Sequence, residues 1–441
     1  MSRELMDQAK KAVLDATRRG AKGVRAVVSR NRASSVEWRD GKIDRLREST
    51  RMALGLTLFV DGRYSVNTTS DLRPAAVDRF LDEVIAMTRV LTKDPHRKLA
   101  DPESYKGRHE GDLKIFDASR TVSAVERRKI AAALEAAARA GSGSAKIVSV
   151  STQCSDNVSE GAMATSNGME GTRTDTSFVL LAMTSVQDRG SRKPQGYSYA
   201  ARRLFLSLPT VESVGMDATR RATQEIGARP EKSGQYRCIL ENRIAGRLLD
   251  WLLGQPLTGR AIQQRRSFLA DKLGRPIASQ VLTVTDDPLL ESGLGSGTYD
   301  GEGMSARRRV VVENGVLKTH YLDTYYASKL ERPPTTESSS NLVFGPGTQG
   351  LDGLLKAMGN GILITGFSGG NSNPATGDFS IGISGHWIEN GKAARPVSEM
   401  NLSGNHLTFW NRLLELGTDA FLDSSTRSPS LRFDTVQFSG K

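Results

Sequence analysis

The sequence contains few cysteines and few histidines. Its 441 residues include two cysteines, Cys154 and Cys238, and five histidines. The cysteines lie far apart and in no CxxC spacing, so the sequence offers no disulfide framework and predicts a reduced, cytoplasmic protein. No two histidines are three or four residues apart. The simplest way of placing two metal ligands on one helix is therefore excluded.

Long apolar runs are also missing. No stretch approaches the ~20 apolar residues that cross a bilayer as a helix. The first twenty residues, "MSRELMDQAKKAVLDATRRG", lack the apolar core and the small-residue cleavage site of a secretory signal. We therefore expect neither a membrane span nor secretion.

Common catalytic motifs are absent as well. The sequence has no GxSxG, neither cysteine stands beside a histidine, and the glycine-rich "GSGTYDGEG" at 295–303 lacks GxxxxGK[ST] and opens no convincing helix. The carboxylate pairs Asp286-Asp287 and Asp300/Glu302 could hold a hard cation, but such pairs more often form turns and caps. The residues alone do not identify an enzyme.

The chain is basic, with a formal net charge of +12. Lys and Arg are spread along its whole length, and the densest groups, at 263–266 and 307–309, are not interleaved with aromatic residues. A nucleic-acid site would combine a basic patch with stacking residues or a groove-reading motif. The pattern therefore argues against specific nucleic-acid binding and favours a basic solvated surface.

The first half alternates helices with strands. The 43 glycines of the whole chain, against 15 prolines, favour many tight turns. Apolar periodicity predicts helices at 2–19, 75–91 (with Asp71 as its cap), 127–140 (after a capping box of Ser123 and Glu126) and 210–226. Strands are predicted at 25–29 and 34–38, followed by a hairpin turn at 39–42, and again over 52–70, where a turn at Asp61-Gly62 separates two strands. Short strands broken by Asn-Gly and Glu-Gly turns are predicted over 146–208. The polar stretch 92–113 reads as a long loop or linker.

The second half is rich in strands and glycine. Two strand–Glu-Asn-Gly–strand segments, at 307–323 and 386–397, predict hairpins. Helices are expected only at 241–253, 323–330, 350–358 and 405–416. We predict an α+β protein of two domains: residues 1–227, with helices packed on an antiparallel or mixed sheet, and residues 228–441, a barrel-like or sheet domain with few helices.

The predicted helix at 241–253, "ENRIAGRLLDWLL", carries no evident chemistry. Ile244, Leu248, Trp251 and Leu252 form one apolar face, which explains the helix as packing. Gly254 and Pro256 end it.

Several long motifs resemble the TldD/PmbA family, and specifically its PmbA (TldE) branch. They are "SFLADKLG" (267–274), "DDP" (286–288), "GTYDGEGMSARRRVVVENGVLKTHYLDTYYASKL" (297–330), "GGNSNPATGDFSIGISGHWIENGK" (369–392) and "PVSEMNLSGN" (396–405). Looser agreement at 40–72 and 166–177 extends the resemblance over nearly the whole chain. The order of these motifs is more specific than any one of them.

The resemblance implies a cytoplasmic metallopeptidase made of two related subunits. The TldD-type subunit carries HExxxH on a helix and a later cysteine; two His and the Cys hold zinc, and the Glu is the general base. Carried over from "SFLADKLG", the His, Glu and His positions hold Asp250, Trp251 and Gln255 here, and the cysteine region falls near 421–425, "FLDSS". We therefore expect no metal and no catalytic residue in this chain, with zinc in the TldD-like partner.

Three hypotheses follow from the resemblance. The first is a non-catalytic subunit that pairs with an HExxxH-bearing partner and holds an extended or unfolded peptide, including leader peptides of peptide natural products. Edges near two glycine-rich stretches are its candidate binding sites, and the residues are Gly295, Gly297, Asp300, Gly369, Gly370 and Asn371. The second is a homodimeric peptide-binding or scaffold protein without protease activity. The third is an independent metallopeptidase that uses Asp250 with His320 or His386.

Overall fold

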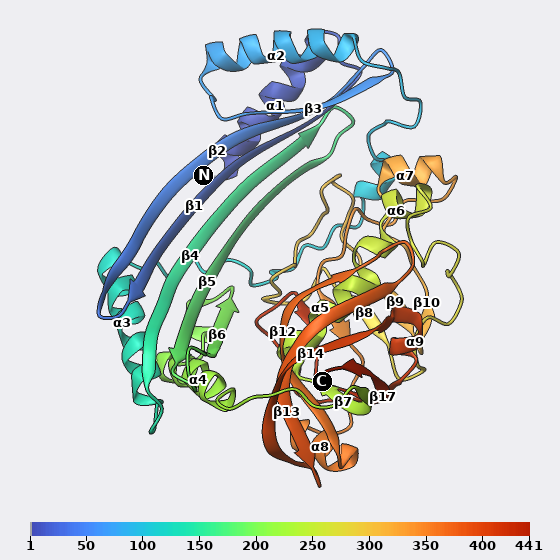
Figure 1. Cartoon of the computed structure of the whole chain (residues 1–441). Coiled ribbons are helices and arrows are strands. Elements are labelled where there is room, and N and C mark those ends of the chain that lie inside the picture. Colours follow the sequence, from blue (N-terminus) through green and yellow to red (C-terminus); the bar gives the residue numbers. More distant parts are fainter. Residues whose placement is uncertain (1) are drawn as a thin grey trace.

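A long, curved sheet forms the first half of the molecule. The computed structural model describes residues 2–441. Six antiparallel strands lie in the order β3 (Arg63–Thr69), β2 (Lys42–Val60), β1 (Gly23–Arg39), β4 (Ile147–Thr165), β5 (Glu170–Val186) and β6 (Gln195–Arg202). Figure 1 shows the sheet curving around the C-terminal half.

The two faces of this sheet differ because side chains alternate along each strand. Even-numbered residues such as Leu56, Leu58 and Leu180 are buried against helices. Helices α1 (Ser2–Arg18) and α2 (Pro74–Arg89) cover one end, and α3 (Ala124–Ala140) and α4 (Val211–Gln224) cover the other. Odd-numbered residues line the concave face, which is turned toward the C-terminal half (Figure 1).

The C-terminal half is built around a closed barrel. Strands β14 (Lys392–Asn405), β13 (Asp378–Glu389), β12 (Gly361–Ser372), β7 (Gly234–Leu240) and β17 (Leu431–Ser439) pair in this order. The pairs Asn401↔Ser439 and Leu402↔Phe438 then join β14 to β17 and close the ring. Strand β15 (Leu413–Leu416) extends it at β17. The predicted α+β fold with a barrel-like second half is confirmed.

A second, smaller sheet and short helices complete this half. The sheet has the order β10 (Val316–Leu317), β9 (Arg309–Glu313), β8 (Val284–Asp286), β11 (Leu342–Phe344) and β16 (Thr426–Arg427). The helices are α5 (Asn242–Leu253), α6 (Gly259–Gln263), α7 (Thr324–Lys329), α8 (Leu351–Met358) and α9 (His406–Trp410). Among the helices of residues 2–441, none has the length and apolar character that a membrane crossing requires.

The linker at 92–113 joins the two halves through side-chain contacts. The guanidinium of Arg97 lies 4.2 Å from the ring centre of Tyr64 and 3.3 Å from that of Tyr325, so it bridges the long sheet and α7. The neighbouring His96 ring bonds Ser328 Oγ at 3.0 Å. Stacked guanidinium contacts of this kind stabilise by about 0.5–2 kcal/mol each.

Several expected elements differ from the observed ones. The strands predicted at 25–29 and 34–38 are one strand, because pairing with β2 and β4 continues through Asn31. The short strands expected over 146–208 are three, two of them long: Glu160-Gly161 lies inside β4 and only Asn167-Gly168 makes a turn. Partners on both sides hold these polar segments extended where local propensity is weak.

Two helix predictions also need correction. The N-cap of α2 is Arg73, and Asp71 accepts a hydrogen bond from the Arg73 backbone N–H at 3.1 Å instead of capping the helix. The helix expected at 405–416 ends at Trp410, and Leu413–Leu416 forms β15 because it pairs with β17.

Candidate functional site

Helix α5 is an amphipathic packing helix that ends abruptly. Ile244, Leu248 and Leu252 are buried in the main core of the C-terminal half. Gly254 ends the helix: a side chain there would meet the Asp250 carbonyl oxygen at 2.5 Å and its carboxylate Oδ1 at 2.6 Å. Only glycine leaves room for the Asp250 side chain to fold back over the helix end.

Asp250, Trp251 and Gln255 do not form a metal site. Asp250 and Gln255 are exposed, whereas Trp251 is half-buried. Surrounding protein replaces part of the water around Asp250, and this desolvation raises the pKa of its carboxyl. Zinc needs three protein ligands and an open position in a hydrolase. One carboxylate, an indole and an amide do not fit zinc, so we derive no zinc chemistry from this helix.

The indole of Trp251 belongs to an aromatic cluster. Its ring centre lies 6.4 Å from that of Phe379 and 6.3 Å from that of His406, and the Arg247 guanidinium lies 5.3 Å above it. His406 is fully buried and stacks on Phe268 with ring centres 5.8 Å apart. At the position that corresponds to the glutamate of HExxxH, this chain therefore has Trp251, which packs against aromatic side chains.

His406 is held as a neutral ring. Burial lowers its pKa to about 4. One ring nitrogen, Nε2, lies 3.0 Å from Ser372 Oγ, and Nδ1 has no hydrogen-bond partner among the described residues. The stacked aromatic neighbours account for its burial.

The segment 421–425 does run beside α5. Asn242 Nδ2 donates to the Asp419 carbonyl at 2.5 Å, and Ser428 Oγ donates to the Asn242 carbonyl at 2.7 Å. Thr426 lies against Gly246, one helical turn before Asp250. The fold therefore brings "FLDSS" toward the helix, where the Arg243 guanidinium lies 5.5 Å from the ring centre of Phe421, and the segment contains no cysteine.

Elsewhere, residues 2–441 contain no group of three or more His, Cys, Asp and Glu side chains that could hold a metal ion. His320 is fully buried, where its ring nitrogens bond Arg332 at 2.9 Å and the Leu269 carbonyl at 3.3 Å. His386 lies on barrel strand β13 and lines a cavity with Arg243 of α5, and neither Asp250 nor His320 lines that cavity. The geometry gives no support to a zinc site built from Asp250 with either histidine.

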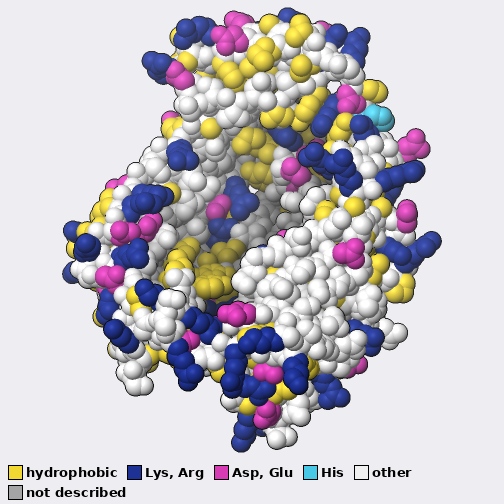
Figure 2. Space-filling model, in the orientation of Figure 1, with side chains coloured by type: hydrophobic (Ala, Val, Ile, Leu, Met, Phe, Trp, Pro, Cys, Tyr) yellow, Lys and Arg dark blue, Asp and Glu magenta, His cyan; other side chains and the backbone are white. Residues whose placement is uncertain are grey.

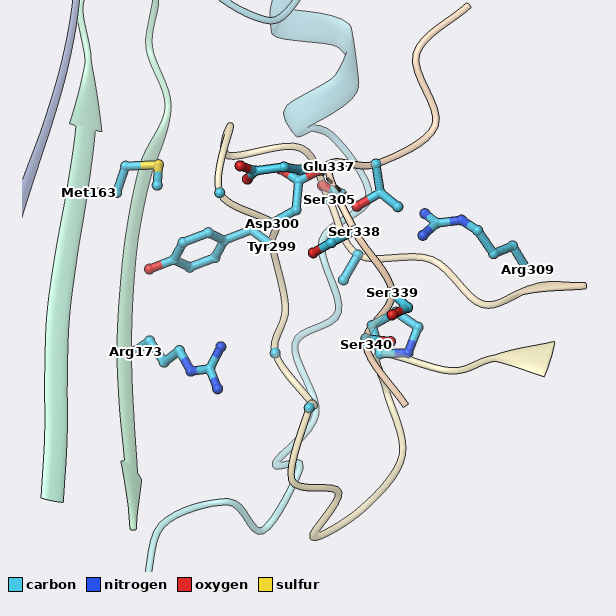
Figure 3. A pocket seen from close by; sticks show the side chains of 16 residues that line it. Met163, Arg173, Tyr299, Asp300, Ser305, Arg309, Glu337, Ser338, Ser339 and Ser340 are labelled. Atoms are coloured by element: carbon cyan, nitrogen blue, oxygen red, sulfur yellow. Dashed lines mark hydrogen bonds between the residues drawn. The ribbon is translucent and has the colours of Figure 1, made fainter. Parts of the chain in front are cut away.

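Three of the six glycine-loop candidates lie together in a cavity of about 340 Å³. Gly295, Gly297 and Asp300 line it with Arg173 of β5 and with Glu337. Figure 2 shows the molecule hollowed between the long sheet and the C-terminal half, and Figure 3 shows Arg173 across the cavity from Asp300 and Glu337. The cavity thus has Arg173 on the sheet side, where its Nε donates to Asp175 at 2.9 Å, and Asp300, Glu337 and Arg309 on the side of the C-terminal half.

The glycines of this cavity also have structural reasons. A side chain at Gly295 would meet the Ser340 carbonyl oxygen at 2.3 Å, whereas one at Gly297 would meet the Arg173 guanidinium at 3.0 Å and the Tyr299 carbonyl oxygen at an ordinary contact distance of 3.8 Å. Asp300 accepts hydrogen bonds from the backbone N–H groups of Glu302 and Met304, both at 3.0 Å. Asp300 therefore forms a turn, as paired carboxylates usually do. The exposed carboxylate of Glu337 remains available in this cavity.

Gly369, Gly370 and Asn371 lie elsewhere, at a bulge of β12. Pairing with β13 is interrupted between Ser368 and Asn371. Gly369 and Gly370 adopt positive φ angles of 59° and 96°, which favour glycine. The Arg247 side chain donates to the Gly369 carbonyl at 2.9 Å and so ties this bulge to α5. The predicted candidates therefore form two separate groups.

Sequence reasoning missed the free edge of β6. Alternate residues of an antiparallel edge strand direct their backbone groups outward. Ala201 does so, because its N–H donates to Asp423 at 2.8 Å. Tyr197 and Tyr199 share this direction, and within the described chain no residue bonds their outward N–H and C=O groups. Their side chains stack with ring centres 6.4 Å apart. The Tyr-x-Tyr spacing in "GYSYA" was the available signal.

This edge borders a small cavity next to helix α5. Tyr197 lines a cavity of about 150 Å³ together with Phe367 and Ser384 of the barrel. Arg243 of α5 lies 3.3 Å from the Ser198 hydroxyl of β6. Helix α5, the barrel and an open strand edge thus meet at one place in the cleft.

Family models match three consecutive parts of the chain. They are described as the PmbA/TldA metallopeptidase domain 1 (residues 24–88), central domain (residues 117–225) and C-terminal domain (residues 233–440). Metalloprotease PmbA of Escherichia coli O157:H7 is 28% identical over 443 residues, which cover 100% of this chain and 97% of that protein. A Haemophilus influenzae PmbA homolog is 26% identical over 449 residues, covering 99% of this chain and 96% of the homolog.

Solved structures share the whole fold. A protein described as a modulator of DNA gyrase from Bacteroides thetaiotaomicron superposes with a TM-score of 0.94 at 37% identity, over 99% of this chain and 98% of that one. TldE from Thermococcus kodakarensis superposes with a TM-score of 0.87 at 19% identity, over 98% and 100%, which is a likeness of fold. The chain belongs to the PmbA/TldD metallopeptidase family.

Proposed function

We propose that this chain is the non-catalytic, TldE-like subunit of a two-subunit zinc peptidase. The observation that carries the proposal is the composition of α5 and the turn that follows it, which have Asp250, Trp251 and Gln255 at the positions of HExxxH. The partner would be a TldD-like chain that supplies zinc, both histidines, the glutamate and the cysteine. The substrate class would be unfolded peptides or the leader peptides of peptide natural products.

In this proposal the chain completes the substrate chamber and holds the peptide. Two features of the cleft support that role. The outward backbone groups of Tyr197 and Tyr199 offer pairing to an extended peptide without regard to its sequence. The cavity around Gly295, Gly297 and Asp300 lies on the loops of the same cleft, with Arg173 and Glu337 to orient charged groups.

The compartment forms part of the same proposal. Cys154 and Cys238 are free and buried. Two cysteines without a disulfide support a reducing compartment, and we place the assembly in the cytoplasm. A homodimeric peptide-binding protein without protease activity is the competing outcome of the test below.

Co-expression with an HExxxH-bearing relative tests this function. We expect the two chains to purify together and to cleave an unfolded peptide, and we expect each chain alone to be inactive. A partner variant with its motif glutamate replaced by Gln is the matched control, which should assemble without cleaving. Failure of the two chains to associate, together with self-association and peptide binding by this chain, would favour the homodimeric alternative.

A further inference from the structure

The outer edge of β2 is open over much of its length. Strand β3 pairs with β2 only from Leu54 to Val60, so in the described chain residues 42–53 have a partner on one side alone. The side chains from Lys42 to Arg51 are all exposed. This edge lies on the opposite side of the sheet from β6, about 19 Å away at ~4.8 Å per strand.

Four residues direct their backbone groups outward along this edge. Strands β2 and β3 are joined by the two-residue turn Asp61-Gly62, so even-numbered residues of β2 face β3. Beyond β3, the same alternation turns Leu46, Glu48, Thr50 and Met52 outward. No other described residue bonds these outward groups. The open stretch is about 20 Å long at ~3.4 Å per residue.

The concave side of the same edge carries a row of arginines. Arg45, Arg47 and Arg51 are odd-numbered and exposed, and none of them forms an ion pair with a described residue. Arg47 and Arg51 border a cavity of about 380 Å³ whose lining includes Asn31, Asn157 and Asp156, and the Asp156 carboxylate is already paired with Arg127. Guanidinium and amide donors together suit a carboxylate-bearing ligand.

A second copy of this edge is a poor partner in most registers. If two copies paired antiparallel through this edge, side chains on one face would have to stay on one face. The two-fold axis would then pass through one residue, which would lie opposite the same residue of the other copy. We call this residue the centre of the register. Centres at 45 and 47 place Arg45 or Arg47 opposite itself. Centres at 46, 48 and 49 place Arg45 opposite Arg47, Arg45 opposite Arg51, and Arg47 opposite Arg51, and a centre at 51 places Arg51 opposite itself. Among centres from 45 to 51, a centre at 50 is the exception, with Thr50 opposite itself and no arginine opposite another. Because like charges directly opposite destabilise a strand pair, most registers of self-pairing are disfavoured.

We propose that the β2 edge between Leu46 and Met52 docks an extended, acidic segment of another protein chain. Open backbone groups favour a peptide over a nucleic acid, and the arginine row favours acidic side chains at alternate positions of that segment. The β2 edge lies across the sheet from β6, the strand that contacts α5, and this separation favours an assembly contact over a substrate contact. The inference does not depend on the peptidase assignment.

Fluorescence anisotropy with the full-length chain tests the proposal. The probe is a labelled peptide that alternates Glu and Thr along the open length, compared with a Lys–Thr peptide and with a Glu–Thr peptide N-methylated on the pairing edge. We expect only the unmodified Glu–Thr peptide to bind. The R45E/R47E/R51E variant should weaken binding by about tenfold or more.

Matched variants separate docking from general charge effects. R79E/R128E/R260E reverses three exposed arginines elsewhere and should change binding by less than about twofold. Thr50→Pro removes one outward N–H without removing a β1 bond and should also weaken binding. Thermal melts check that every variant folds.

Three results would overturn the proposal. They are no binding of the Glu–Thr peptide, equal binding of the N-methylated peptide, and equal loss in both triple variants. If the assembled peptidase cleaves the Glu–Thr peptide and cleavage falls with binding in R45E/R47E/R51E, the edge is a substrate site and the partner-docking proposal fails.

Discussion

Replacing Trp251 by alanine should lower the free energy of unfolding by about 2–3 kcal/mol. Truncating a fully buried Trp costs about 3–5 kcal/mol, and Trp251 is only half-buried. The loss combines its contacts with Phe379 and His406 and the stacked Arg247 guanidinium. Urea unfolding followed by far-UV circular dichroism measures the change without relying on Trp fluorescence.

The two flanking positions serve as controls for this prediction. Gln255→Ala and Asp250→Asn alter exposed side chains and should each change stability by less than about 0.5 kcal/mol near pH 7. Folding raises the pKa of the Asp250 carboxyl, so this group contributes to the free energy of unfolding at low pH, where it is protonated. That contribution is lost as pH rises and the carboxyl ionises. Asp250→Asn should therefore gain relative to wild type as pH rises above about 4.

One pattern of results would refute the reasoning. If Trp251→Ala left stability within about 0.5 kcal/mol while Asp250→Asn or Gln255→Ala abolished the activity of the assembled peptidase, α5 would be a functional helix and not a packing helix.

Three further predictions follow from buried groups. Arg127→Ala should cost about 3–5 kcal/mol in urea unfolding, because it leaves the buried carboxylate of Asp156 without its guanidinium partner. Cys154 and Cys238 should not react with a thiol reagent until the chain unfolds, since burial raises both thiol pKa values, that of Cys154 to about 12. Because burial holds the pKa of His406 at about 4, stability should fall as pH drops from about 6.5 toward 4, and the stability difference between wild type and His406→Gln should shrink over that range.

Each of these predictions has a simple counter-result. Arg128→Ala, at an exposed neighbouring arginine, is the control for the ion pair and should be nearly neutral; equal costs would contradict the role of burial. Rapid modification of either thiol in the native chain would contradict the burial of the cysteines. A wild-type to His406→Gln difference that stays constant with pH would show that His406 titrates normally.

Local elements were predictable from the sequence because local signals specify them. The hairpin turn at Asn314-Gly315, the Ser123 cap of α3 and the glycine end of α5 each depend on a few neighbouring residues. The long strands were not predictable to the same degree. Residues such as Asn31 and Gly161 have weak strand preference, and partners far along the chain hold them in the sheet.

The candidate site shows the same division. The degenerate positions 250, 251 and 255 could be found because a motif fixes their spacing. The cavity wall of Arg173 and Glu337 could not, since it joins segments more than 150 residues apart in the sequence. Sequence also could not show where the two glycine-rich stretches lie: Gly295 borders the cleft cavity, whereas Gly369 forms a bulge of the barrel.

Zinc content of the isolated chain tests the central claim most directly. The full-length protein, purified without a partner and dialysed against trace chelator, should contain far less than one zinc per chain, because Asp250, Trp251 and Gln255 provide one possible ligand where a hydrolytic site needs three. One zinc per isolated chain, lost on Asp250→Ala, would contradict the account and establish this chain as a metallopeptidase in its own right.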